Sequence, residues 1–254
     1  MKEGKLDNNN RQNRNQNKNK EQYERYKRVL GDEFIHDTFE KFQDIKYGDK
    51  NKWNDLKAKY KTVNKYKVDY GEVKASEILR LDKISLDNKK LMHNRSTRLH
   101  GNIGVLSFDN QCKIAHSKIN YQFNDSFVNF KGTKDNIILM TETPVYKTLK
   151  KGELVDGKVS KSDRMYDSEA KFFEYMRELH PNKNDTFEFT ILLERNICES
   201  CRKVKEQFEN DYKNATINIV SGKKFIRYKQ KTDSTIKEVE VSPWEWRKGL
   251  KEQK

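Results

Sequence analysis

Apolar side chains between residues 21 and 90 recur at mostly three- and four-residue steps, the period of one face of an α-helix. The first series is Tyr23, Tyr26, Leu30, Phe34, Phe39, Phe42 and Ile45, and the second is Trp53, Leu56, Tyr60 and Val63. These two series predict two amphipathic helices. A third helix is expected from Ser76, a candidate N-cap, through Ile84.

Beyond residue 98 the apolar period shortens to that of a β-strand. Residues 101–108 and 112–119 have the pattern of two strands, and the polar turn at 109–111 joins them. This arrangement predicts an antiparallel hairpin. Residues 120–163 contain Pro144, several glycines and many lysines, and they predict loops and short strands.

Helix and strand patterns then alternate along the chain. They predict a helix at 170–179, a strand at 187–193, a helix at 201–212 and a strand at 215–219. A strand, a helix and a strand in this order form a βαβ unit, whose two strands are parallel. The fold class is therefore α/β. Residues 225–228 and 236–241 predict a further hairpin near the C-terminus.

The same patterns divide the chain into three parts. Residues 1–20 consist mostly of Asn, Gln, Lys and Arg, a composition that does not offset the entropy of ordering. We expect a disordered tail at 1–20, a helical N-terminal segment at 21–95 and an α/β domain at 96–254.

Composition narrows the class of protein. Of the 254 residues, 33% are hydrophobic, and no apolar run approaches the roughly 20 residues that cross a bilayer. The N-terminus also lacks a signal-peptide hydrophobic region. We therefore expect neither a membrane span nor a conventional secretory signal.

Charge and cysteine content indicate a partner class and a compartment. The net charge of +14 is spread along the chain, and it fits a nucleic-acid partner as well as a lysine-rich solvated surface. Three cysteines cannot all pair in disulfides. We expect the protein to act in a reducing cytoplasm, and any export to use a route without a conventional signal peptide.

Two short motifs could carry chemistry. Cys198 and Cys201 form a C-x-x-C where a predicted strand gives way to a helix. A helix N-terminus stabilises anions, so we expect both thiols to have lowered pKa values, ready for a metal or for redox exchange. Asp167 and Glu169 begin the preceding predicted helix, where capping alone would explain both carboxylates.

Taken together, the two motifs resemble the zinc-dependent nucleic-acid deaminase superfamily, whose signature is H-x-E followed by P-C-x-x-C. The run RMYDSEAK at 164–171 is most similar to bacterial polymorphic-toxin deaminases, including a clade in which Asp replaces the zinc-binding His. The strands GNIGVLSF and CKIAHSKI resemble the opening hairpin of those domains. The resemblance covers residues 101 to about 222.

The resemblance implies a cytidine deaminase-like mixed sheet with a zinc site at two helix N-termini, preceded by the helical segment. Asp167, Cys198 and Cys201 would hold Zn²⁺, and Glu169 would be the catalytic proton carrier. The implied reaction is hydrolytic deamination of a nucleobase in DNA or RNA, with cytosine to uracil expected and adenine as the alternative. The domain would be a toxin effector, and an immunity protein is an expected partner.

Further residues are candidates for substrate contact. His116 and Ser117 lie at the end of the second predicted strand, where a core histidine is the alternative reading. The basic and aromatic stretch after residue 222 suits single-stranded nucleic acid, although an edge strand protected by lysines fits equally. Its candidate residues are Lys223, Lys224, Arg227 and Tyr228.

Two other functions remain open at this point. A thioredoxin-like thiol–disulfide oxidoreductase also places C-x-x-C between a strand and a helix, but it leaves the Asp-x-Glu helix start unused. A non-enzymatic, zinc-stabilised nucleic-acid-binding module would use the cysteines for structure alone.

Overall fold

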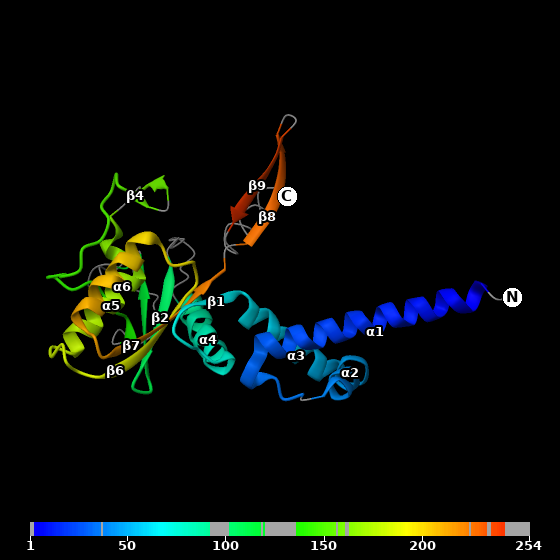
Figure 1. Ribbon diagram of the computed structural model, residues 1–254. Helices are drawn as coiled ribbons and strands as arrows, with labels where there is room; N and C mark the ends of the chain where they lie inside the picture. Colours follow the sequence, from blue (N-terminus) through cyan, green and yellow to red (C-terminus); the bar gives the residue numbers. More distant parts are fainter. Residues whose placement is uncertain are drawn as a thin grey trace. The chain divides into compact units, whose positions relative to one another are not determined.

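The computed structural model forms two compact units (Figure 1). The first unit comprises residues 1–65 and 74–80, and the second comprises 66–73 and 81–254. The residues that the structure describes are 3–36, 38–91, 102–117, 119, 136–155, 157–160, 163–223, 225–232 and 235–241.

The first unit consists of helices packed through aromatic rings. Its elements are α1 (Glu3–Leu30), η1 (Gly31–Glu33), α2 (Phe39–Gly48) and α3 (Lys50–Asn64). Tyr26 stacks on Tyr60 with ring centroids 4.1 Å apart, and Phe42 is fully buried. Two helices were predicted for this region. The structure has three, because Gly31 adopts a φ of +47° and ends α1.

The N-terminal residues differ from the predicted disordered tail, because α1 begins at Glu3. The sequence contains no proline there to interrupt a helix that Tyr23 and Tyr26 anchor farther along. The Lys46 ammonium donates to the side-chain oxygen of Asn19 at 2.6 Å. Side chains from Arg14 to Lys18 are exposed, so this part of α1 adds no core.

The third predicted helix is present as α4 (Ala75–Leu91), but its cap differs from the prediction. Asp32 Oδ1 accepts hydrogen bonds from the backbone N–H groups of Ala75 and Ser76, at 3.0 and 3.4 Å. The Ser76 hydroxyl itself donates to Asp32. The cap is therefore supplied by a residue distant in sequence.

Strand β1 (Tyr66–Tyr70) was not predicted. It pairs antiparallel with β7 (Ala215–Gly222) at one edge of the sheet. Consequently the second unit takes in residues 66–73 and the second half of α4. This division differs from the predicted boundary between residues 95 and 96.

The second unit is built on a mixed five-stranded sheet in the order β1-β7-β6-β2-β3. As predicted, β2 (Ile103–Phe108) and β3 (Gln111–His116) form an antiparallel hairpin. Asp109 and Asn110 turn between them with φ values of 44° and 58°, as a type I′ turn requires. The predicted βαβ unit is confirmed, because β6 (Phe187–Leu193) and β7 are parallel and α6 (Glu199–Asp211) connects them.

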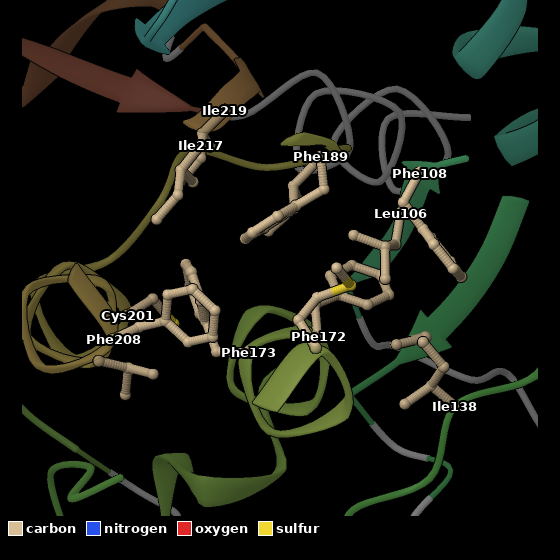
Figure 2. Packing of buried hydrophobic residues seen from close by; sticks show 14 of the residues in the cluster. Leu106, Phe108, Ile138, Phe172, Phe173, Phe189, Cys201, Phe208, Ile217 and Ile219 are labelled. Atoms are coloured by element: carbon tan, nitrogen blue, oxygen red, sulfur yellow. The ribbon is translucent and has the colours of Figure 1, made fainter. Parts of the chain in front are cut away.

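Helices α5 (Ser168–Leu179) and α6 lie side by side against the sheet (Figure 1). Phe172 and Phe173 of α5 reach into the core shown in Figure 2, and the Phe173 and Phe208 ring centroids are 5.2 Å apart. A Cβ on Gly104 of β2 would lie 2.6 Å from Phe172. The absence of a side chain at residue 104 therefore lets α5 approach the sheet closely.

The remaining elements agree with the predicted loops, short strands and C-terminal hairpin. They are β4 (Leu154–Val155), β5 (Lys158–Val159), η4 (Arg164–Tyr166), β8 (Phe225–Thr232) and β9 (Thr235–Val241). The strands pair antiparallel as β4 with β5 and as β8 with β9. Among the helices in the described ranges, none has an apolar stretch long enough to cross a bilayer.

Candidate active site

The N-termini of α5 and α6 bring the two sequence motifs together. Asp167 is the N-cap residue of α5, and Cys198 is the N-cap residue of α6. Asp167 Oδ2 lies 3.6 Å from the sulfur of Cys198 and 3.6 Å from that of Cys201, and the two sulfurs are 3.3 Å apart. One oxygen and two sulfurs thus form a nearly equilateral triangle.

This triangle fits a zinc ion. Tetrahedral zinc, with bonds of about 2.3 Å to sulfur and about 2.1 Å to oxygen, separates sulfur from oxygen by about 3.6 Å and two sulfurs by about 3.8 Å. The Asp167–cysteine distances match, and the sulfur–sulfur distance is shorter by about half an ångström. Within the described part of the chain, these three residues are the group of acidic and sulfur side chains close enough to share a metal.

Glu169 is buried in the first turn of α5 and is 3% exposed. Burial, and then the neighbouring Asp167 carboxylate, raise the pKa of its carboxyl to about 8. Burial also raises the pKa of Asp167, although the Arg164 guanidinium opposes that shift. Without a cation, both carboxyl groups therefore hold their protons more tightly than exposed ones do.

The thiol at residue 201 behaves differently from the expectation. Its hydrogen bond with Cys198, and then its burial, raise the Cys201 pKa well above the usual value. The neighbouring carboxylates of Glu169 and Asp167 raise the Cys201 pKa further, because they disfavour another negative charge. Together these effects outweigh the stabilisation of a thiolate by the helix N-terminus. A dication would reverse this balance by stabilising the deprotonated ligands together.

Family comparison identifies the domain that carries this site. The family model for toxin deaminases, described as the BURPS668_1122 family of deaminases, matches residues 87–223, which is just over half of the chain. The chain belongs to this family. No curated protein and no solved structure matches the toxin deaminase. Among the functions that the sequence left open, membership of this family supports the deaminase. It implies that the protein is a hydrolytic deaminase and that this domain is a toxin domain.

Arg164 is a residue of the candidate site to which sequence reasoning assigned no role. Its Nη1 lies 3.5 Å from Asp167 Oδ2, the oxygen that faces both sulfurs. Zinc with two thiolates and one carboxylate would carry one net negative charge, which the guanidinium would offset. The position of Arg164 three residues before Asp167 was visible in the sequence, but the contact depends on the turn of η4.

Ser200, between the two cysteines, anchors the segment that leads into the site. Its Oγ accepts a hydrogen bond from the Leu149 N–H at 2.9 Å, and the Leu149 carbonyl accepts from the Arg164 N–H at 3.0 Å. The segment that ends at Asp167 is therefore tied to α6 beside Cys201. Sequence reasoning missed this role, since a serine on a helix gives no signal for a partner 51 residues away.

Two charged side chains of α5 are buried, contrary to the appearance of an amphipathic helix. Lys171 has no exposed surface, and its Nζ donates to the carbonyls of His116 and Ile119. Glu174 Oε1 accepts from the N–H groups of Val145 and Tyr146, at 2.7 Å each. Both side chains fasten connecting segments onto α5.

Two of the predicted substrate residues lie close to the helix start. His116 is buried at the end of β3. Ser117 Oγ accepts from the Asn102 N–H at 2.8 Å, and the Asn102 carbonyl accepts from Ser168, the residue between Asp167 and Glu169. The end of the β2–β3 hairpin is therefore held beside the candidate active site.

The predicted basic stretch gives less information. Lys223 follows β7, and partial burial lowers its pKa. Lys224 lies outside the described residues. Arg227 and Tyr228 belong to β8, in the separate β8–β9 hairpin, and their side chains are outside the described set. The substrate role of these four residues stays a prediction.

Proposed function

We propose that this toxin deaminase hydrolyses the exocyclic amino group of cytosine in nucleic acid, using zinc held by Asp167, Cys198 and Cys201. The observation that carries the proposal is the ligand triangle, with the buried carboxyl of Glu169 beside it on the same helix turn. When bound by three protein ligands, zinc supplies an acidified water as the nucleophile.

Glu169 is the group that moves protons in the proposed reaction. Its pKa of about 8 places it near neutrality, where a carboxyl can both accept and return a proton. It accepts the proton of the attacking water, donates it to the ring nitrogen N3, and assists the departure of ammonia. Burial keeps bulk water from competing for that proton.

Arg164 has a supporting role in the proposal. It lies within 3.5 Å of Asp167 Oδ2, so it lowers the energy of the extra negative charge that a carboxylate ligand introduces in place of a neutral histidine. His116 and Ser117 are proposed to contact the substrate, because the hydrogen bonds through Asn102 hold their strand end against α5.

The test is a deamination assay with matched variants. The purified protein is incubated with DNA and RNA of mixed sequence, single- and double-stranded, and the products are sequenced for C-to-U and A-to-I changes. Glu169→Gln should keep its zinc and lose at least about 10⁴-fold in rate, the upper range of general acid–base catalysis. Asp167→Asn should lose zinc and activity together.

The outcomes separate the parts of the proposal. A Glu169→Gln protein within about tenfold of the parent rate would remove the proton-transfer role. Conversion of adenine alone would replace cytosine as the substrate. Full activity in protein that contains no zinc would exclude the metal. The proposal also includes action in a reducing cytoplasm and neutralisation by an immunity protein, to be tested by co-expression.

A further inference from the structure

Buried polar atoms without hydrogen-bond partners gather around the candidate active site. Of the six such side-chain atoms within the described ranges, four are Asn102 Oδ1, Arg164 Nε, Arg195 Nε and Asn196 Oδ1, and the other two belong to Tyr146 and His180. Arg164 contacts Asp167, and Asn196 is two residues before Cys198. Native proteins leave few buried polar atoms unpaired, and such atoms at a site indicate a missing ligand or water.

The sheet register places Arg195 next to Asn102. The Glu194 N–H, just beyond the end of β6, donates to the Ile103 carbonyl at 3.2 Å. Because β2 and β6 run antiparallel, the next residue, Arg195, lies opposite Asn102. The Asn102 carbonyl in turn accepts from Ser168 at 2.8 Å. Arg195 is thereby placed at the carboxyl end of β6, beside the start of α5.

A close backbone approach also fixes this position. A Cβ on Gly222, at the end of β7, would lie 2.2 Å from the Glu194 carbonyl oxygen and 3.5 Å from Arg195 Cα. Only glycine lets β7 come this near. Arg195 thus stands where two parallel strands end together, which is the place where open α/β sheets bind their ligands.

The surroundings of Arg195 leave its charge available to a ligand. The adjacent acid, Glu194, forms an ion pair with Lys89. Within the described part of the chain, Arg195 Nε is buried without a hydrogen-bond partner, and the residue as a whole is partly exposed. A guanidinium offers only donors, in a planar fork that matches the oxygens of a phosphate.

We propose that Arg195 binds a phosphate group of the nucleotide whose base enters the active site. This inference rests on the proposed function, because it makes the anion part of the deaminase substrate. The phosphate could belong to a free nucleotide or to a nucleic-acid strand, and both present the same oxygens to the guanidinium.

The experiment measures binding without turnover. Full-length, zinc-loaded Glu169→Gln protein is titrated with cytidine, with cytidine 5′-monophosphate, and with a short single-stranded DNA that contains one cytosine. Arg195→Gln and Arg195→Lys are then introduced into this protein. The control is Lys213→Gln, which removes the same charge from an exposed residue between α6 and β7, at the opposite end of β7.

Arg195→Gln should weaken binding of the phosphate-bearing probes by about 10- to 100-fold, as expected for one charge-assisted hydrogen-bonding group. Cytidine binding should stay within about twofold. For the oligonucleotide, the slope of log affinity against log salt should fall by about 0.7. Arg195→Lys should bind more tightly than Arg195→Gln, and Lys213→Gln should match the parent.

Each outcome decides the proposal. Weakening with both phosphate-bearing probes assigns the target nucleotide's own phosphate, and weakening with the oligonucleotide alone assigns a phosphate of the strand. Three outcomes would overturn the proposal. Arg195→Gln could lower the affinity for cytidine as much as for the phosphate-bearing probes, or it could lower the affinity for no probe. The Glu169→Gln protein could also bind none of the probes. Failure of the parent to deaminate any substrate would instead refute the proposed function, and the binding result would stand separately.

Discussion

Lys171, a buried residue of α5, should make the stability of the protein depend on pH. The side chain has no exposed surface, and its Nζ donates to the carbonyls of His116 at 2.8 Å and Ile119 at 2.6 Å. Burial lowers its pKa to about 7, although the Asp167 carboxylate acts in the opposite direction. Replacement by methionine keeps an unbranched side chain of similar length but removes the titrating group.

The sign of the pH effect follows from the proton balance. A lysine in the unfolded chain has a pKa of about 10.4, so between pH 7 and pH 10.4 the unfolded protein binds one more proton at this residue than the folded protein. The free energy of unfolding therefore rises with pH in this window, by about 1.4 kcal/mol per unit. From pH 7 to pH 9 Lys171 should contribute about 2–3 kcal/mol, and below pH 7 its contribution should level off.

Proton loss leaves the hydrogen bonds intact. A neutral amine still has two N–H donors, which match the two carbonyls that accept from Lys171. The methionine variant loses both bonds at every pH. That loss shifts its stability by a constant amount and leaves the pH-dependent difference as the signature of the lysine.

The assay is urea-induced unfolding of the parent and Lys171→Met at several pH values from 6 to 9, followed by hydrogen exchange of residues 168–179. Between pH 7 and pH 9 the free energy of unfolding of the parent should rise by about 2–3 kcal/mol relative to that of the variant. Lys213→Met, at an exposed lysine, controls for the loss of a lysine as such. Identical pH dependence of parent and Lys171→Met, or a difference that grows toward acid, would refute the reasoning.

Three further predictions concern packing, metal and the N-terminus. Gly104→Ala should destabilise the protein by about 1–3 kcal/mol in thermal melts, because its Cβ would lie 2.6 Å from Phe172, whereas Gly48→Ala, with no atom within 4 Å, should not. Cys201→Ser should lower zinc content, and its melting temperature should no longer respond to a chelator that destabilises the parent; an unchanged chelator response would contradict the metal site. Deletion of residues 1–20 should leave the melting temperature within about one degree and the deamination rate unchanged, because Arg14 to Lys18 are exposed.

The sequence by itself determined the central α/β elements. Apolar alternation at 101–108, 187–193 and 215–219 predicted three strands of the sheet, and the polar turn at 109–111 predicted the hairpin. The βαβ unit also followed from order alone, since a crossover helix makes the two strands parallel. These features were readable because periodicity and turn chemistry act over a few neighbouring residues.

Other features depended on contacts between distant residues. The sequence YKVDY at 66–70 alternates apolar and charged side chains, but a run of five residues does not by itself specify a strand. It becomes a strand because the edge of β7 offers it backbone partners. Asp32 caps α4 from 43 residues away. Lys171 looks like a solvated helix residue, but it is buried, and its Nζ donates to the distant carbonyls of His116 and Ile119.

The candidate site divides in the same way. The C-x-x-C motif and the Asp-x-Glu helix start pointed to the candidate ligands and to the proposed proton carrier, because the spacing within one helix turn sets local geometry. Only the tertiary structure decided that Asp167 Oδ2 lies 3.6 Å from both sulfurs, 31 and 34 residues along the chain. It also decided that Arg164 faces the same oxygen and that Arg195 stands at the common strand end. The physical reason is that two helices packed on one sheet bring their N-termini together, and no local pattern in either helix encodes that distance.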